Sequence, residues 1–425
     1  MMRSMFAAIS GLKNHQTFMD VVGNNIANVN TTGFKQSRVT FQDILSQTVR
    51  TASGPQGGLG GVNPEQVGLG TLISGIDTIQ TQGTLQSTGK LTDMAIQGDG
   101  YFVMSDGKQQ LFTRDGSFDL GIDGTLVNPA DGLHVMGWMP DPTTGLLNTA
   151  TPPADIKIPI GAGMIGKAST GLTISGNLDA NTASSTATPP GTPYPVSTTV
   201  YDAQGNAVPI ALTFTKAGPN QWTYTVTSTQ AGVTIAGPTP SGNVVFDGAG
   251  KITTPSSTTP DSFTITYATT GNTVPTTPQK IALDLSGMTQ LASSPSSLTG
   301  NTDGASAGTL TSFTVGAGGD ITGVYSNGYK QSLGQMALAS FANPDGLMKA
   351  GGNLFSSSAN SGTAQIGQPN TAGRGTIATG FLEGSNVDLA QQFTNMIMAE
   401  RGFQANSRVI TTSDEILQDL VNIKH

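Results

Sequence analysis

Cysteine is absent from all 425 residues of the sequence. Disulfide scaffolds, thiol catalysis and cysteine metal sites are therefore excluded. We expect a chain that works in the cytosol or is exported by a route independent of disulfides. The stretch from Met1 to Gly11 has one arginine, no continuous apolar h-region and no obvious cleavage site. We therefore expect export, if it occurs, without a cleavable signal peptide.

Charge is also scarce, because charged residues make up 11% of the chain and the net charge is −8. A nucleic-acid-binding protein would show a basic patch, and so would a protein that binds anionic membranes. We therefore expect no nucleic-acid partner. No apolar run reaches the roughly 18 residues of a membrane helix, so we expect no membrane insertion.

Residues that could carry chemistry are few and scattered. His134 lies in a turn, without a ligand partner nearby in sequence, and we expect a structural or surface role. The segment Asp119–Gly124 resembles a calcium loop, but Ala130 stands where the bidentate glutamate belongs. The glycines of Gly316–Asp320 lack the Lys-Ser/Thr of a phosphate loop. We predict no catalytic residue, no metal site and no cofactor, and therefore no enzyme.

Two amphipathic segments lie at opposite ends of the chain. In both, apolar residues recur every seven positions, a period typical of a helix that packs along another helix. The pattern fits two independent surface helices or a paired, coiled-coil-like stem, and we favour the stem. The predicted seam, with the residues that widen it, comprises Met5, Ile9, Leu12, Met19, Val22, Ile26, Leu389, Phe393, Met396, Phe403, Ile410, Leu417 and Val421.

The remaining faces of these segments carry amides more than charges. Such a face suits crowded contacts or a neutral polar lumen, whereas a solvated helix usually carries Lys and Glu pairs. The amides are Asn14, Gln16, Asn24, Asn25, Asn28, Gln391, Gln392, Asn395, Gln404 and Asn406.

Glycines and a capping motif add local expectations for the same helices. Gly402 costs about 1 kcal/mol in a helix interior, so we expect close approach of a neighbouring helix there, and the same at Gly11 and Gly23. Ser385 to Asp388 fits a capping box that begins the C-terminal helix with Ser385.

The middle of the chain has a β pattern. Asp-Gly pairs at close spacing predict tight turns in a compact antiparallel domain. A Pro- and Thr-rich stretch with alternating strands predicts a second β domain, a sandwich or flattened barrel, inserted in the first. The glycines from Gly54 to Gly61 predict a long extended connector between Thr51 and about Gly70, with Gly57, Gly58, Gly60 and Gly61 as its flexible positions.

The predicted fold is therefore α+β and multi-domain, with long terminal helices and two nested, mainly β domains between them. We divide the chain into a terminal helical domain (1–30 with 386–425), a connector region (31–72 with 360–385), a first β domain (73–159 with 300–359) and an inserted outer β domain (160–299).

Several motifs resemble those of the flagellar rod and hook axial proteins. The matching positions at the two ends are Asn24, Asn25, Ala27, Asn28, Thr32, Gly33, Phe34, Ser385, Asn386, Val387 and Asp388. Gly58–Gly70 and Asp93–Phe102 are similar to the hook members of this family in particular. The resemblance covers about half of the chain and leaves its middle unmatched.

The resemblance implies an extracellular hook subunit that polymerises helically with its own copies. The expected polymer is a curved, hollow tube, a universal joint that transmits motor torque to the filament and a conduit for exported subunits. Implied partners are the distal rod protein, the hook cap, the hook–filament junction proteins and the type III export apparatus.

Three other interpretations stay open. A distal rod subunit of the same family would be expected to lack the insertion at 160–299. An extracellular adhesin or stalk would need a signal peptide or anchor, and a secreted hydrolase would need a convergent His or carboxylate site. The sequence shows no evident signal peptide, anchor or convergent His or carboxylate site.

Overall fold

The computed structural model describes residues 2–55, 60–141, 145–161, 163–164, 166–236, 241–255, 261–267, 278–292 and 294–422. The chain forms two compact units. The first comprises Met1–Pro159, Thr314–Thr322 and Ser332–His425, and the second comprises Ile160–Phe313 and Gly323–Gln331. The four-part domain division drawn from the sequence stays a prediction.

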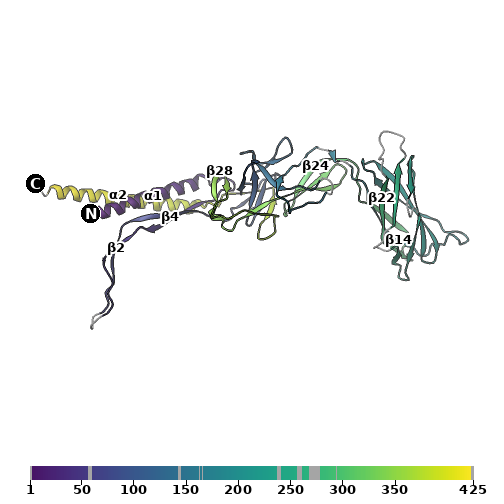
Figure 1. Ribbon diagram of the computed structural model, residues 1–425, viewed down its shortest axis with the longest axis horizontal. Helices are drawn as coiled ribbons and strands as arrows, with labels where there is room; N and C mark the ends of the chain where they lie inside the picture. Colours follow the sequence, from purple (N-terminus) through teal and green to yellow (C-terminus); the bar gives the residue numbers. More distant parts are fainter. Residues whose placement is uncertain are drawn as a thin grey trace. The chain divides into compact units, whose positions relative to one another are not determined.

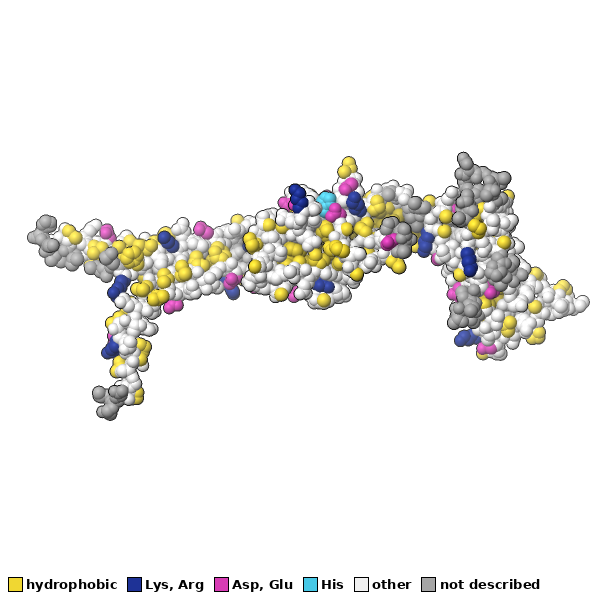
Figure 2. Space-filling view, in the orientation of Figure 1, with side chains coloured by type: hydrophobic (Ala, Val, Ile, Leu, Met, Phe, Trp, Pro, Cys, Tyr) yellow, Lys and Arg dark blue, Asp and Glu magenta, His cyan; other side chains and the backbone are white. Residues whose placement is uncertain are grey.

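The first unit contains both long helices, α1 (Met2–Ala27) and α2 (Leu389–Asn422). They lie side by side, α1 in purple and α2 in yellow (Figure 1). The helices are antiparallel, because Gly11 lies against Asn406 while Asn25 donates to Gln392. The predicted pairing of the two ends is therefore confirmed, and the alternative of independent surface helices is wrong. Apolar side chains remain visible along the pair (Figure 2).

Two antiparallel ribbons follow α1. Strand β1 (Ser37–Asp43) pairs with β4 (Thr71–Thr78), and β2 (Ser46–Arg50) pairs with β3 (Glu65–Gly68). The expectation of an extended connector is wrong for its second half, because β3 belongs to a hairpin. Ser53 also bridges Val62. Gly57 and Gly58 lie outside the described residues, whereas Gly60 and Gly61 directly precede Val62 of this bridge.

The β part of the first unit is built on short antiparallel pairings. Two small ladders join β5 (Leu85–Ser87) to β32 (Phe381–Glu383) and β6 (Met94–Gln97) to β31 (Thr376–Thr379). Strands β24, β25 and β26 contribute residues to both units. A larger sheet contains β7 (Tyr101–Ser105), β8 (Gln110–Thr113), β9 (Asp119–Leu120), β10 (Leu126–Val127), β11 (His134–Trp138), β12 (Ala154–Asp155), β24 (Gly308–Val315), β25 (Asp320–Tyr325), β26 (Lys330–Met336), β27 (Leu338–Ser340), β28 (Met348–Gly351), β29 (Leu354–Ser356) and β30 (Gln365–Gly367).

This sheet joins strands that precede the second unit to strands that follow it. Strand β27 pairs with β7, so the segment after the second unit completes the domain begun before it. A short 3-10 turn, η1 (Pro344–Gly346), precedes β28. The core includes Tyr101, Phe112, Trp138 and Phe355. The sequence prediction of a nested architecture is confirmed.

The second unit is a β sandwich with a core between two five-stranded sheets. The first sheet has the order β18 (Val233–Ala236), β21 (Asp261–Tyr267), β22 (Gln279–Leu291), β14 (Gly171–Asp179), β23 (Ser297–Thr302). The second has the order β15 (Tyr194–Tyr201), β16 (Ala207–Gly218), β17 (Gln221–Ser228), β19 (Ser241–Phe246), β20 (Ile252–Thr254). The short strand β13 (Gly163–Met164) pairs with β24.

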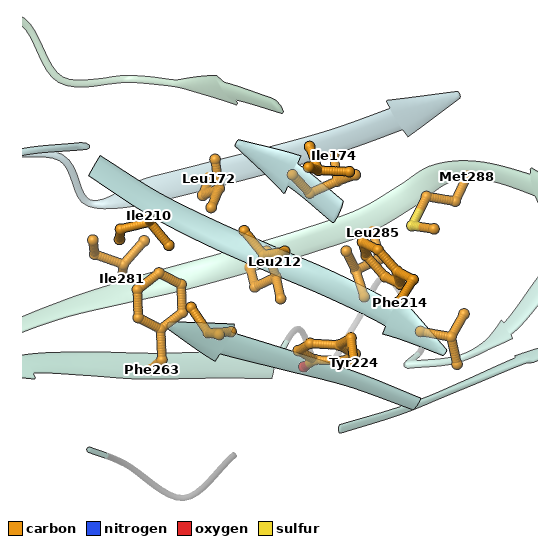
Figure 3. Packing of buried hydrophobic residues seen from close by; sticks show 14 of the residues in the cluster. Leu172, Ile174, Ile210, Leu212, Phe214, Tyr224, Phe263, Ile281, Leu285 and Met288 are labelled. Carbon is orange, nitrogen blue, oxygen red and sulfur yellow. The ribbon is translucent and has the colours of Figure 1, made fainter. Parts of the chain in front are cut away.

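Alternation along the strands explains why this core forms. Every second residue is buried from Val208 to Phe214 in β16, from Trp222 to Val226 in β17 and from Phe263 to Tyr267 in β21. In Figure 3, Leu212 and Phe214 of one sheet approach Leu285 of the other. The apolar and threonine alternation of these segments in the sequence predicts such a half-buried sheet.

Candidate assembly surface

The seam of the helix pair follows a strict alternation of four- and three-residue steps along α2. Its α1-facing positions are Gln392, Met396, Ala399, Phe403, Asn406, Ile410, Ser413 and Leu417. The sequence identified only the large apolar half of this stripe. Gln392, Ala399 and Ser413 are buried although they are polar or small. Their spacing of seven and fourteen residues, with Asn406 midway in the longer interval, is the signal that could have found them.

Two glycines allow the helices to approach closely. A Cβ atom at Gly402 would lie 2.5 Å from the His15 ring, and one at Gly11 would lie 2.8 Å from Nδ2 of Asn406. The expected close approach therefore occurs at both positions. At Gly23 an added Cβ would meet nothing of this chain within 4 Å, so the close approach of a neighbouring helix in an assembly stays a prediction there.

Several of the amides lie inside the interface and not on an open polar face. Asn25 is buried, and its Nδ2 donates to Gln392 Oε1 at 3.2 Å and to the Ser37 carbonyl at 2.8 Å. Gln392 Nε2 donates in turn to Gln36 Oε1 at 3.0 Å. Asn14 is buried too and donates to Thr71 Oγ1 at 3.0 Å. These bonds tie α1, α2 and the following strands together.

Asn386 makes the corresponding link on the C-terminal side. Its Oδ1 accepts from the Gln36 amide at 2.8 Å, and its Nδ2 donates to the Ile79 carbonyl at 2.8 Å. The backbone groups beside β1 and β4 therefore find their partners in a side chain from the other end of the chain. This placement gives a physical reason for an asparagine in the matched C-terminal motif.

The cap of α2 differs from the sequence expectation. Asp388 Oδ1 accepts from the amides of Ala390 at 2.9 Å and Gln391 at 3.3 Å. Ser385 Oγ accepts only from the Val387 amide, ahead of the helix. The N-cap is therefore Asp388, and the prediction that Ser385 caps the helix is wrong by three residues. An aspartate satisfies the same free amides as a serine and also suits the helix dipole.

A buried ion cluster lies where the β domain meets the helices. Lys35 Nζ lies 2.7 Å from Glu383 Oε1, and Arg114 Nη1 lies 3.3 Å from Glu383 Oε2. Burial lowers the pKa of Lys35, and the adjacent Glu383 carboxylate only partly offsets this effect. Lys35 also donates to the Thr81 carbonyl. No sequence pattern predicts the cluster, because its members come from three distant segments.

Gly33 of the matched N-terminal motif borders this cluster. It has a φ of +66°, and a Cβ there would lie 2.6 Å from the Asp115 amide nitrogen. Its own amide donates to the Glu383 carbonyl at 2.8 Å. Only glycine combines this conformation with this proximity.

The other motif residues have mixed surroundings. Asn28 donates to Asn24 Oδ1 at 2.7 Å, and the Thr32 carbonyl accepts from Asn353 at 2.8 Å. Lys349 lies over the ring of Phe34 at 5.3 Å. Ala27 is exposed and ends α1, and Val387 is half-buried.

The predicted seam residues divide into two groups. Val22 is buried, and the half-buried members are Met5, Leu12, Met19, Ile26, Met396, Phe403, Ile410 and Leu417. Ile9, Leu389, Phe393 and Val421 are exposed. We define the outer helix surface as the exposed apolar side chains of both helices, namely Phe6, Ile9, Leu389, Phe393, Ile397, Met398, Val409, Ile416 and Val421.

The ribbons carry exposed apolar side chains as well. Phe41 packs its ring edge-on against Phe18 of α1, with 5.7 Å between ring centroids. We define the ribbon surface as Phe41, Ile44, Leu45, Val49, Val62, Val67, Leu72 and Ile76, all of them exposed. A cleft of about 360 Å³ lies beside it, with Phe18, Val22 and Val39 among its walls.

Other candidate sites offer little chemistry. His134 Nδ1 lies 3.0 Å from Asp155 Oδ2, a partner that the sequence did not reveal. Among the described residues, no group of three or more His, Asp or Glu side chains could hold a metal ion. None of the helices, as far as they are described, is long and apolar enough to cross a membrane.

Family models match four parts of the chain. The model described as "Flagella basal body rod protein" matches residues 5–35, and "Flagellar basal body rod FlgEFG protein C-terminal" matches residues 378–423. "Flagellar hook protein FlgE/F/G D1 domain" matches residues 95–177. "Flagellar basal body protein FlaE D2 domain" matches residues 177–305 in the sandwich.

Curated relatives match over full length. The chain is 42% identical to flagellar hook protein FlgE of Borreliella burgdorferi and 40% identical to that of Treponema pallidum, with 100% of each chain covered. It is 33% identical to flagellar basal-body rod protein FlgG of Bacillus subtilis, again with 100% of both covered. A relative named as a rod protein thus aligns across the sandwich, so the insertion alone does not separate the two functions.

A solved structure shares the fold. The crystal structure of Helicobacter pylori flagellar hook protein FlgE2 matches with a TM-score of 0.50 and 16% identity, over 70% of this chain and 100% of that chain. At this identity the likeness supports the α+β, multi-domain fold alone.

Proposed function

Since the chain belongs to the flagellar hook protein family, we propose that its outer helix surface and ribbon surface hold the hook polymer together. The chain is a structural subunit of the bacterial flagellar hook. The higher identity to the hook relatives makes a distal rod subunit the less favoured alternative.

One observation carries this proposal. The helix pair buries its seam and still exposes large apolar side chains on both helices, such as Phe6 and Phe393. Large contiguous apolar surfaces on soluble proteins mark contacts with other molecules. When one surface docks on a different surface of the next copy, the contacts do not close and a helical polymer grows.

Surfaces in other parts of the chain would suit a flexible tube. Polar, threonine-rich strands of the sandwich, such as β17, would allow neighbouring copies to slide as the tube turns. The ribbons would let the β domains shift relative to the stem. We therefore propose that the polymer acts as a universal joint. Replacing residues 51–70 by a shorter rigid segment should straighten the hooks, and normally curved hooks from that variant would contradict the idea.

The inner wall of the tube is a further part of the proposal. From Leu389 to Ala399, α2 has no charged residue, and Gln391 Nε2 donates to Asn395 Oδ1 at 3.1 Å. A neutral, amide-bearing wall would let unfolded subunits pass without strong binding. Gln391→Lys should then slow export of later subunits, and an unchanged export rate would count against this role.

Membership of the family supports a proposal about partners and location. We propose that the chain leaves the cell through the type III export apparatus, without a cleavable signal peptide, and forms an extracellular structure. Its contacts would include the distal rod protein, the hook cap and the hook–filament junction proteins. We propose that the chain neither binds nucleic acid nor inserts into a membrane, and that it is not an enzyme.

Electron microscopy of the purified full-length chain separates hook from rod. Curved, hollow tubes would support the hook assignment, whereas straight tubes would favour the rod subunit. A dilute monomer should also have mobile terminal helices, because their apolar surfaces lack cover before assembly. Fully ordered helices in the dilute monomer, by NMR, would contradict this expectation.

A further inference from the structure

Two apolar patches flank the seam of α2 on either side and lie at different positions along the helix axis. Phe393 and Ile397 form the first patch, with exposed fractions of 51% and 58%. Val409 and Ile416 form the second patch, with exposed fractions of 42% and 47%.

The phase of the helix fixes the sides. Phe393 and Ile397 each follow a seam residue by one position, namely Gln392 and Met396. Val409 and Ile416 each precede one, namely Ile410 and Leu417. One residue corresponds to a rotation of about 100°. The first patch is therefore turned away from the seam in one direction and the second patch in the other.

From this arrangement, and on the basis of the proposed function, we propose that the first patch of one copy packs on the second patch of the next copy. Copies related by one screw operation present opposite flanks of α2 to their two neighbours. Each copy would therefore use both patches, one on each side. Such a contact between unlike surfaces stays open at both ends, as a helical polymer requires.

The spacing of the patches sets the stagger. Val409 follows Phe393 by 16 residues, and Ile416 follows Ile397 by 19. Parallel neighbouring helices offset by roughly 24 to 29 Å along their axes would bring both pairs together. The difference between the two offsets, about 5 Å, is within the combined reach of two long side chains.

Met398 and Val421 are exposed on the same helix but belong to neither patch. The ribbon surface of a neighbouring copy is the competing occupant of the first patch, with Val49 as an exposed member. The test below distinguishes the two occupants.

Engineered cysteines test the contact directly, because the natural chain has none. A disulfide requires Cα atoms about 4.4 to 6.8 Å apart, so it reports proximity. Tubes of the double variant Ile397→Cys/Ile416→Cys should oxidise to a ladder of dimers, trimers and larger species on a denaturing gel. Each single variant should stay monomeric, since a residue in a contact between unlike surfaces does not meet its own copy. Mixed tubes of the two single variants should yield dimers without a ladder.

A second pair, Phe393→Cys/Val409→Cys, repeats the test if the first variant assembles poorly. Tubes without a ladder from either pair would overturn the inference, and so would dimers from a single variant. A ladder from Ile397→Cys/Val49→Cys in their place would assign the first patch to the ribbon surface. Failure of the unsubstituted chain to form any tubes would instead contradict the proposed function.

Discussion

Gly402 of α2 lies directly against the imidazole of His15 in α1, and Gly11 of α1 receives Asn406 of α2 four residues away on each helix. Each helix therefore provides one glycine notch and one polar side chain that fills the notch of its partner. This reciprocal arrangement fits one antiparallel register of the stem. A shift by one turn would place neither side chain opposite a glycine.

Gly402→Ala should destabilise the assembled stem. In an isolated helix this change would stabilise by about 1 kcal/mol, but the added methyl group would overlap the His15 ring. Overpacking of this kind costs about 1 to 3 kcal/mol. The temperature at which tubes lose their helical circular dichroism should therefore fall. Adding His15→Ala should restore part of the loss, and Gly23→Ala, where there is room, serves as the matched control. Equal melting of the Gly402 and Gly23 variants would show that the notch is not needed.

Glu383→Gln should strongly destabilise the first unit. The substitution would leave the Lys35 ammonium and the Arg114 guanidinium buried without their shared carboxylate. Removing one member of a buried ion pair costs about 3 to 5 kcal/mol. Urea unfolding should show this loss. Lys90→Gln removes an exposed ion pair with Asp119 and should leave the urea midpoint nearly unchanged. Similar midpoints for both variants would mean that the buried cluster contributes no more than a surface pair.

The first unit should lose stability at alkaline pH through Tyr101. Burial raises the pKa of Tyr101 to about 12, and its hydroxyl donates to Gln80 Oε1 at 2.8 Å. In the unfolded chain a tyrosine titrates near pH ~10. Between these values the unfolded state has lost the proton while the folded state retains it. This contribution is therefore fully present below pH ~10 and falls as the pH rises toward 12, by about 2 to 3 kcal/mol. The free energy of unfolding of Tyr101→Phe should decline less over this range, and parallel declines would refute the assignment.

Asp388→Ala should weaken the start of α2. It would remove the acceptor for the Ala390 and Gln391 amides, at a cost of about 0.5 to 2 kcal/mol. Ser385→Ala is the matched control, because that hydroxyl bonds only the Val387 amide ahead of the helix. We expect the Asp388 variant to lower the melting temperature of tubes more than the Ser385 variant does. The reverse order would restore Ser385 as the cap.

Much of the architecture could be predicted from the sequence, because the spacing of apolar residues in helices and strands can be recognised without a structure. The seven-residue spacing identified the seam positions that carry large apolar side chains. The alternation of apolar and polar residues identified strands such as β16 and β21. The polar seam positions were missed because glutamine and asparagine are usually exposed to solvent. In the structure, Gln392 accepts a hydrogen bond from Asn25 and Asn406 lies against Gly11, both on the partner helix.

Long-range contacts were beyond reach for a different reason. The ion cluster joins Lys35, Arg114 and Glu383, whose separations in sequence have no periodic signature. The pairing of β2 with β3 was missed because the glycine-rich sequence between these strands predicts an irregular connector. The apolar side chains that stay exposed, such as Phe393, are those that the partner helix does not cover. Identifying them requires the positions of both helices in the fold.

The most direct test of the central claim compares the full-length chain with a version that lacks residues 1–30 and 386–425. Electron microscopy of both, under identical salt and concentration, reports assembly without any assumption about individual contacts. We expect curved, hollow tubes from the full-length chain and none from the truncated version. Tubes of the same form from the truncated version would contradict the claim that the terminal helices hold the polymer together.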